Sequence, residues 1–330
     1  MGKGIALQFR QAYPEMFKSY ADACRAGAVK LGQIDVFDLG GLVSGPRWIF
    51  NFPTKGHWRA KSKLIDIETG LDALIEAIER LGVQSVAVPP LGCGNGGLDW
   101  VDVRPMIERA FSKIPEVEVL LYPPSGSPEA AAMPNRTERP KMTVGRAALV
   151  ALMDRYVQSL LDPVVSLLEV HKLMYFMQEA GQDLRLKYVA GQYGPYAGNL
   201  RHVLIKLEGH FLQGYGDGED APSKPIELMA GAVEEASDFI AADTVVAARI
   251  ERVAALLSGY EDPYGMELLS SVHWVTCQNR AARDSVDVAI EAVHAWNARK
   301  RDTLKAPHLA KAWERLKLLK WDSEARSAIH

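Results

Sequence analysis

The sequence predicts an α/β layered sandwich followed by a mainly helical domain. Between residues 33 and 122, short apolar segments typical of buried strands alternate with segments of helical periodicity. After residue 143, most of the chain has helical periodicity. Five prolines lie between these regions, at positions 123, 124, 128, 134 and 140, and they leave neither a helix nor a paired strand intact. We therefore expect an α/β domain at 1–122, a proline-rich linker at 123–143 and a helical domain at 144–330.

The first domain is expected to have four short strands, at Gln33–Leu39, Trp48–Phe52, Ser85–Val88 and Val117–Tyr122. Its clearest helix is Ile65–Leu81, where apolar residues recur every three or four positions and Gly82 provides a stop. Further helical segments are expected from Leu7 to about Gly27 and at Val103–Ile114, the latter with Pro105 in its first turn.

The second domain combines helices with one predicted hairpin, whose strands are Phe211–Tyr215 and Ile226–Met229. Helices followed by such a β-wing favour a winged-helix-like α+β core with additional helices. The expected helices are Arg146–Leu160, Val164–Glu179, Asn199–Glu208, Gly231–Ile240, Thr244–Ser258, Gly265–Cys277, Ser285–Arg299 and His308–Lys320.

Composition excludes several classes of protein. No apolar run approaches the roughly 20 residues that span a bilayer, and the first residues lack the apolar core of a signal peptide, so we expect a cytoplasmic protein without a membrane partner. A net charge of −3 argues against broad phosphate contact, so any DNA would be a locally held substrate. Cys24, Cys93 and Cys277 are too scattered for a disulfide framework or a zinc site, and no metal is predicted.

Two glycine-rich segments are suited to holding a phosphate. Met1–Ala6 precedes a helical segment, where main-chain N–H groups and the helix N-terminus favour an anion. Pro89–Trp100 follows a buried strand and has glycine at four of the six positions 92–97, which suits a pocket wall that wraps a diphosphate. The alternatives are a plain turn for the first segment and a flexible loop for the second.

A third segment, Asn51–Lys63, directly follows a predicted strand. Lys55 lies between the strand end and a glycine, from which its amine could point into a cleft and act as a base or nucleophile at an anomeric carbon. Basic side chains alternate around Trp58, a pattern that suits a nucleic-acid backbone with a stacked base. The candidate DNA contacts are His57, Trp58 and Arg59; the alternative is a solvated basic loop.

Taken together, the motifs GKGIA, NFPTK-x-HWR and PPLGCGNGGLDW resemble the macrodomain of the DarG antitoxin family over most of residues 1–122. The resemblance implies a three-layer α/β/α macrodomain that binds ADP-ribose, with Lys55 as the catalytic residue. The residues it implies for ADP-ribose binding are Gly2, Lys3, Gly4, Ile5 and Ala6 in one loop, Leu91, Gly92, Cys93, Gly94, Asn95, Gly96 and Gly97 in another, and Thr54 beside Lys55.

The resemblance further implies hydrolysis of an N-glycosidic bond that removes ADP-ribose from thymidine in single-stranded DNA, without a metal or another cofactor. Asp99 is a second candidate polar group, although a helix-cap role is favoured. Cys93 is disfavoured as a nucleophile because no base is evident near it. A serine-hydrolase reading also fails, because no G-x-S-x-G motif is present.

Members of that family carry about two dozen more residues before GKGIA, including an opening strand, whose absence would expose backbone and core. The resemblance therefore describes an N-terminally truncated macrodomain, because Met1 falls inside the first ligand loop. Two functions stay open at this point. The chain is either an active ADP-ribosyl glycohydrolase with a toxin-binding domain, or a non-catalytic ADP-ribose-binding or purely toxin-neutralising protein.

The C-terminal half resembles the matching part of DarG in two motifs, Glu169–Gln178 and Gln192–Tyr196, which we expect to form core helix and turn rather than a site. The resemblance implies direct inhibition of a cognate DarT-like toxin by DNA mimicry. An acidic stretch would supply the charge, although a solvated face is the simpler reading. Its residues are Asp217, Glu219, Asp220, Glu227, Glu234, Glu235, Asp238 and Asp243.

Overall fold

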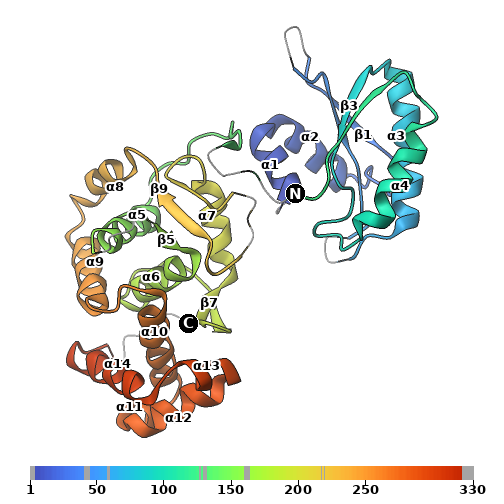
Figure 1. The fold of residues 1–330 in the computed structure, drawn as a ribbon. Helices are drawn as coiled ribbons and strands as arrows, with labels where there is room; N and C mark the ends of the chain where they lie inside the picture. Colours follow the sequence, from blue (N-terminus) through green and yellow to red (C-terminus); the bar gives the residue numbers. More distant parts are fainter. Residues whose placement is uncertain are drawn as a thin grey trace. The chain divides into compact units, whose positions relative to one another are not determined.

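The computed structural model describes residues 4–40, 45–57, 60–125, 128, 132–159, 164–216, 218 and 220–321. Its internal contacts divide the chain into two compact units, Met1–Thr137 and Glu138–His330 (Figure 1). Among the helices so described, none combines the length and the apolar character that crossing a bilayer requires.

The proline-rich segment packs against each unit near the boundary between them. The main-chain N–H of Arg136 donates to the Gln11 carbonyl in the first unit (2.8 Å). Within the second unit, the Arg139 guanidinium lies 4.2 Å from the centre of the Phe211 ring and donates to Glu235 (2.8 Å). The described residues at this end of the segment are therefore anchored rather than fully solvated.

The first unit begins with two helices and continues with alternating strands and helices. Figure 1 shows its strands between α1 and α2 on one side and α3 and α4 on the other, the three layers of the predicted sandwich. The described strands pair as two two-stranded sheets, β1 with β2 antiparallel and β3 with β4 parallel. The elements are α1 (Gly4–Ala12), α2 (Pro14–Arg25), β1 (Asp35–Asp38), β2 (Trp48–Asn51), α3 (Leu64–Leu81), β3 (Ser85–Val88), α4 (Trp100–Phe111) and β4 (Glu118–Leu121).

One hydrophobic core joins both sheets to α3 and α4. The buried face of α3 includes Ile67, Leu71 and Ile78, and it packs with Ile107 of α4 and Val88 of β3. Burying an aliphatic side chain of this size contributes about 1.5–3 kcal/mol, so this face is the main support of the strands. The ends of the strands, from which the loops of the candidate site extend, are thereby held in place.

The long helix expected from Leu7 to Gly27 is wrong, because it is two helices. Pro14 occupies the first turn of α2, where its missing N–H costs nothing, whereas inside a continuous helix its ring would clash with the preceding turn. The first helix, α1, also begins earlier than expected. Gly4 is its first residue and has a φ of +58°, and Ile5 and Ala6 belong to its first turn. Gly4–Ala6 are therefore a helix start rather than a loop.

The second unit is mainly helical, as expected, and contains small antiparallel sheets. Its three-stranded sheet has the order β5-β9-β8, in which β9 pairs antiparallel with both neighbours, and β8 and β9 form the predicted wing. The first elements are α5 (Val144–Val157), β5 (Val165–Ser166), α6 (Leu167–Glu179), β6 (Tyr188–Gly191), β7 (Gly194–Ala197), η2 (Gly198–Leu200), α7 (Arg201–Leu207), β8 (Leu212–Gln213) and β9 (Pro225–Leu228). The remaining helices are α8 (Ala232–Ile240), α9 (Thr244–Leu257), α10 (Pro263–Gln278), α11 (Arg280–Asp284), α12 (Val286–Trp296), α13 (Ala298–Thr303) and α14 (Ala306–Leu318).

Several local features of this unit differ from the sequence-based expectation, among them helix α11, which was not predicted. The helix predicted from Val164 starts at Leu167, because Ser166 caps it and its N–H donates to the Glu169 carboxylate (2.6 Å). The helix predicted at Ser285–Arg299 is interrupted at Asn297, which caps α13 by accepting the Lys300 N–H (2.8 Å). The hairpin formed by β6 and β7 was not predicted.

Candidate active site

The three sequence motifs of the first unit meet at Asn95. The Lys55 amine donates to the Asn95 main-chain oxygen (2.9 Å). On the other side, a Cβ built on Gly4 would lie 3.5 Å from the Asn95 side-chain nitrogen. A helix start, a strand end and a glycine-rich turn that are far apart in the sequence are thus brought into contact.

The glycine loop, which we define as Leu91–Gly97, is a compact series of turns after β3. Gly92 and Gly97 have φ values of +72° and +76°, a backbone conformation that glycine adopts without strain. The loop is closed by three main-chain hydrogen bonds, from Cys93 to Pro90 (3.1 Å), from Gly97 to Gly94 (3.0 Å) and from Leu98 to Gly92 (3.1 Å). It is therefore an ordered turn, not the flexible loop of the alternative reading.

The carbonyl and N–H groups of the glycine loop differ in how many of them form hydrogen bonds within the protein. Its carbonyls at Gly92, Gly94, Asn95 and Gly96 each accept a hydrogen bond from the protein. The N–H groups of Gly94, Asn95 and Gly96 donate to no acceptor among the residues that the structure describes. Main-chain N–H groups without a protein acceptor are available to donate to an anion, so this arrangement suits a phosphate oxygen.

Lys55 is carried by the short segment that leaves β2. Strand β2 pairs with β1 and packs Phe50 against the core of the first unit, which fixes the point where this segment begins. Lys55 is half-buried, and its amine is held beside the glycine loop by the bond to Asn95. An amine beside main-chain N–H groups that could hold a phosphate is suitably placed for a nucleophile or proton-transfer group that acts on a sugar-phosphate ligand.

The other predicted contacts are distributed around this centre. Thr54 is half-buried beside Lys55, and Leu91, the first residue of the glycine loop, is buried in the core of the unit. His57 is exposed, which is compatible with a DNA contact. The remaining candidates, Gly2, Lys3, Trp58 and Arg59, lie outside the described residues.

Asp99 and Cys93 have structural explanations. The Asp99 carboxylate accepts the Val101 N–H (3.0 Å) as the N-cap of α4, the role that the sequence favoured. Burial, followed by the negative charge of Asp99, raises the pKa of the Cys93 thiol. A raised pKa keeps the thiol protonated, so Cys93 is poorly suited to act as a nucleophile.

Ser62 is a residue that the sequence analysis missed. Its main-chain N–H donates to the Gly96 carbonyl (3.0 Å), and its side chain is buried against the glycine loop. A serine within a run of basic residues carries no signal of burial, because polar residues at such positions are usually solvated. Only the packing of the loop onto the Lys55 segment places Ser62 in the interior.

The second unit contains a buried polar cluster around its Tyr193-Gly194-Pro195 motif. The Lys172 amine donates to the Pro195 carbonyl (2.8 Å), and burial, followed by the charge of Lys300, lowers the pKa of Lys172 to about 7. Gly194 has a φ of +103°, and a Cβ there would meet the Lys172 amine at 3.2 Å. The motif is therefore a tightly packed hairpin end that belongs to the core, as the sequence predicted.

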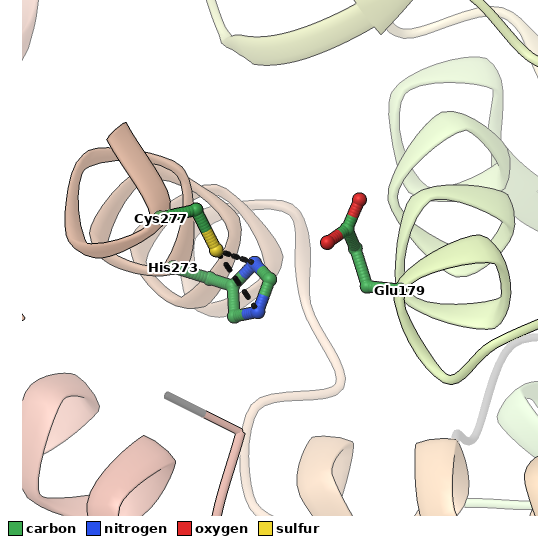
Figure 2. Close-up of side chains that lie close together, drawn as sticks. All are labelled: Glu179, His273 and Cys277. Carbon is green, nitrogen blue, oxygen red and sulfur yellow. Dashed lines mark hydrogen bonds between the residues drawn. The ribbon is translucent and has the colours of Figure 1, made fainter. Parts of the chain in front are cut away.

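A second buried cluster, shown in Figure 2, comprises Glu179, His273 and Cys277, whose polar atoms lie within 4.8 Å of one another. The two ring nitrogens of His273 already have partners, the Tyr175 hydroxyl at 2.8 Å and the Trp321 carbonyl at 3.1 Å. A metal would have to displace one of these bonds. The cluster is therefore explained as a polar centre that joins α6, α10 and Trp321, which follows α14 in the chain.

The acidic stretch is divided between structural and exposed side chains. Asp243 caps α9 by accepting the Val246 N–H (3.1 Å), and Glu235 pairs with Arg139. Glu234 and Asp238 are exposed on α8. Asp220 accepts the Tyr215 hydroxyl and Glu227 the Gln213 amide, while Asp217 and Glu219 lie outside the described residues.

Sequence comparison assigns this arrangement to a family. The profile described as Macro domain matches residues 1–107. The "DNA ADP-ribosyl glycohydrolase" of Mycobacterium tuberculosis is 45% identical over 312 residues, which cover 91% of this chain and 87% of the relative. The chain belongs to the DNA ADP-ribosyl glycohydrolase family. The family member of Thermus aquaticus is 43% identical over 316 residues, covering 96% of this chain and 86% of the relative.

A solved structure described as "Macrodomain of Mycobacterium tuberculosis DarG" is 57% identical to the first unit, with a TM-score of 0.37. The match covers 38% of this chain and 82% of that one. Membership of this family rests on the sequence identity over both units. The α/β unit is accordingly a macrodomain, and the mainly helical unit is the C-terminal part that the family shares.

Proposed function

We propose that the chain is an antitoxin whose macrodomain hydrolyses ADP-ribose from thymidine bases of single-stranded DNA in the cytoplasm. The observation that carries this proposal is the Lys55 amine, held 2.9 Å from the glycine loop at Asn95, beside main-chain N–H groups that lack a protein acceptor. Relatives that are 43–45% identical and named DNA ADP-ribosyl glycohydrolase support the substrate class.

In the proposed reaction, the glycine loop holds the diphosphate of ADP-ribose through its N–H groups, and the start of α1 faces the same ligand from the side of Gly4. The Lys55 amine leaves its bond to Asn95. It then attacks C1″ of the distal ribose, or assists the attack of another group on that carbon. The bond from C1″ to the thymine nitrogen breaks, the nitrogen takes up a proton, and water supplies the hydroxyl group of free ADP-ribose. The chemistry needs no cofactor.

Incubating the full chain with an ADP-ribosylated single-stranded oligonucleotide tests this proposal. We expect release of free ADP-ribose and unmodified DNA, with saturable heat on titration of ADP-ribose in a calorimeter. Binding without release would favour the alternative function, a non-catalytic ADP-ribose-binding protein. If the chain shows no binding and no release, the proposed macrodomain function is overturned, and toxin neutralisation remains as the function.

We also propose that the second unit binds a cognate DarT-like toxin through the exposed acidic face of α8. A protein that modifies DNA presents a basic groove to its substrate, and a rigid acidic surface is complementary to it. Glu234 and Asp238 are the exposed carboxylates that support this role, whereas Glu235 is engaged by Arg139.

Charge reversal on α8 distinguishes this surface from a merely solvated face. Glu234→Lys should weaken toxin binding, and the difference from the unmodified chain should shrink as salt is added. Glu291→Lys makes the same charge change at an exposed position on α12 and serves as the control. Equal affinities for both variants would remove α8 from the proposed interface.

A further inference from the structure

Ser62 lies beneath the glycine loop and contacts it at two points. Its main-chain N–H donates to the Gly96 carbonyl (3.0 Å). A Cβ built on Gly92 would lie 3.2 Å from the Ser62 Cβ, and a Cβ built on Gly96 would lie 2.3 Å from the Ser62 hydroxyl oxygen. These contacts bracket Gly94 and Asn95, whose N–H groups point to no protein acceptor among the described residues.

The Ser62 side chain is only 6% exposed, and its hydroxyl has no hydrogen-bond partner within the described part of the chain. A buried hydroxyl without a partner is unfavourable, and native proteins retain few of them. Its location against a ligand loop, rather than in the general core, indicates that a change of the loop could supply the missing bond.

The Gly92 carbonyl is an acceptor close to the Ser62 hydroxyl. The Cβ position on Gly96 lies 2.3 Å from the Gly92 oxygen and 2.3 Å from the Ser62 hydroxyl oxygen, so the two oxygens are separated by at most twice that distance. Gly92 accepts one bond, from the Leu98 N–H, and a carbonyl oxygen has two lone pairs. A small shift of the loop therefore allows the hydroxyl to donate to Gly92.

We propose that Ser62 is a positioning residue of the ADP-ribose site, whose hydroxyl donates to the Gly92 carbonyl in the loop conformation that holds the diphosphate. This inference rests on the proposed function. A diphosphate that attracts the N–H groups of Gly94–Gly96 draws the loop toward itself, and the new bond stabilises that conformation. Stabilising the binding-competent conformation raises affinity for the ligand.

A separate contact of Ser62, the bond from its main-chain N–H to the Gly96 carbonyl, bears on the position of the reactive amine. Gly96 is held by Ser62, and its neighbour Asn95 holds Lys55. Ser62 thus acts on the chemistry through the loop and touches no reacting atom. A residue that only filled space would instead contribute equally to the stability of the ligand-free protein and to that of the complex.

Ser62→Ala separates these two roles in the full chain. Removing an unpaired hydroxyl should leave the thermal midpoint of the ligand-free protein unchanged or higher, whereas loss of the bond made in the complex should weaken ADP-ribose binding about tenfold. Calorimetric titration with ADP-ribose and thermal unfolding with and without it measure both effects. Ser112→Ala is the control, because that hydroxyl already donates to the Arg109 carbonyl (2.7 Å) at the end of α4.

Wild-type affinity in Ser62→Ala would overturn the positioning role. So would a loss of affinity matched by lower stability of the ligand-free protein, since that is the result of a packing role. If the unmodified chain itself produces no heat with ADP-ribose, the proposed function fails and takes this inference with it. If the unmodified chain binds ADP-ribose and Ser62→Ala binds it equally well, only the positioning role fails and the proposed function stands.

Discussion

Lys55 donates a hydrogen bond of 2.9 Å to the main-chain oxygen of Asn95, which lies 40 positions later in the chain. This contact, together with the bond from the Ser62 N–H to the Gly96 carbonyl (3.0 Å), joins the segment after β2 to the glycine loop after β3. The bond also occupies the amine in the ligand-free protein. In the proposed reaction, the amine leaves this bond for a contact with the sugar.

Lys55→Ala should abolish release of ADP-ribose from modified DNA and spare ADP-ribose binding. Lys55→Arg keeps a donor for the Asn95 carbonyl but replaces the amine with a guanidinium, which stays protonated and cannot act as a nucleophile. We therefore expect both variants to lose at least about 100-fold in the rate of release, with dissociation constants for ADP-ribose close to that of the unmodified chain. Lys61→Ala, an exposed lysine of the same segment, is the control, and full activity of either Lys55 variant would refute the mechanism.

Gly96 and Gly94 should respond differently to the same added methyl group. A Cβ on Gly96 would lie 2.3 Å from the main-chain oxygen of Gly92, so the loop must distort, and we expect a loss of about 1–3 kcal/mol in the free energy of unfolding. A Cβ on Gly94 meets nothing within 4 Å, and the change should stay within about 0.5 kcal/mol. Denaturant unfolding of the two variants measures this difference, and similar stabilities would contradict the described packing of the loop.

Asp99→Ala should destabilise the macrodomain by about 1 kcal/mol, because the N-terminus of α4 loses its side-chain cap. Asp99→Asn retains an oxygen that can accept the Val101 N–H and should restore most of the stability. Release of ADP-ribose by the folded Asn variant should match that of the unmodified chain. A large loss of release in Asp99→Asn would show that the carboxylate takes part in the chemistry.

His171 should make the stability of the second unit depend on acid. Burial, followed by the charge of Lys172, lowers its pKa to about 3, against 6.5 in the unfolded chain, while Asp220 opposes the shift. Between these values the unfolded chain binds a proton that the folded chain excludes. Stability therefore falls as the pH drops from about 6.5 toward 3, with a slope approaching about 1.4 kcal/mol per pH unit.

His171→Phe preserves an aromatic ring against Tyr196, on which His171 stacks at 4.6 Å, and removes the titrating group. Urea unfolding followed by tryptophan fluorescence across this acidic range should give a shallower pH dependence for the variant. Parallel pH dependences for the two proteins would mean that other groups govern acid unfolding.

The sequence predicted the bounds of helices and strands most accurately where a residue pattern is compatible with one structure alone. The regular apolar spacing and terminal glycine of α3 gave its limits to within one residue, and β3 was predicted at its observed bounds. The helix from Leu7 failed because its apolar pattern continues through Pro14 although the backbone cannot. The β6–β7 hairpin was missed because Gly191 and Gly194 suggested only a turn, and their strand pairing depends on packing against α6 and α10.

The same distinction holds for the candidate site, where the sequence specified the residue types and the tertiary structure decided their contacts. The chain itself specified the family motifs, the lysine and the glycines, because residue types that fit a phosphate and an anomeric carbon are few and their order is distinctive. Which groups face one another was decided by the tertiary structure alone. The Lys55–Asn95 bond, the capping role of Asp99 and the burial of Ser62 each depend on segments that meet only when the core around α3 and α4 has formed, since hydrogen bonding and burial are properties of neighbours in space.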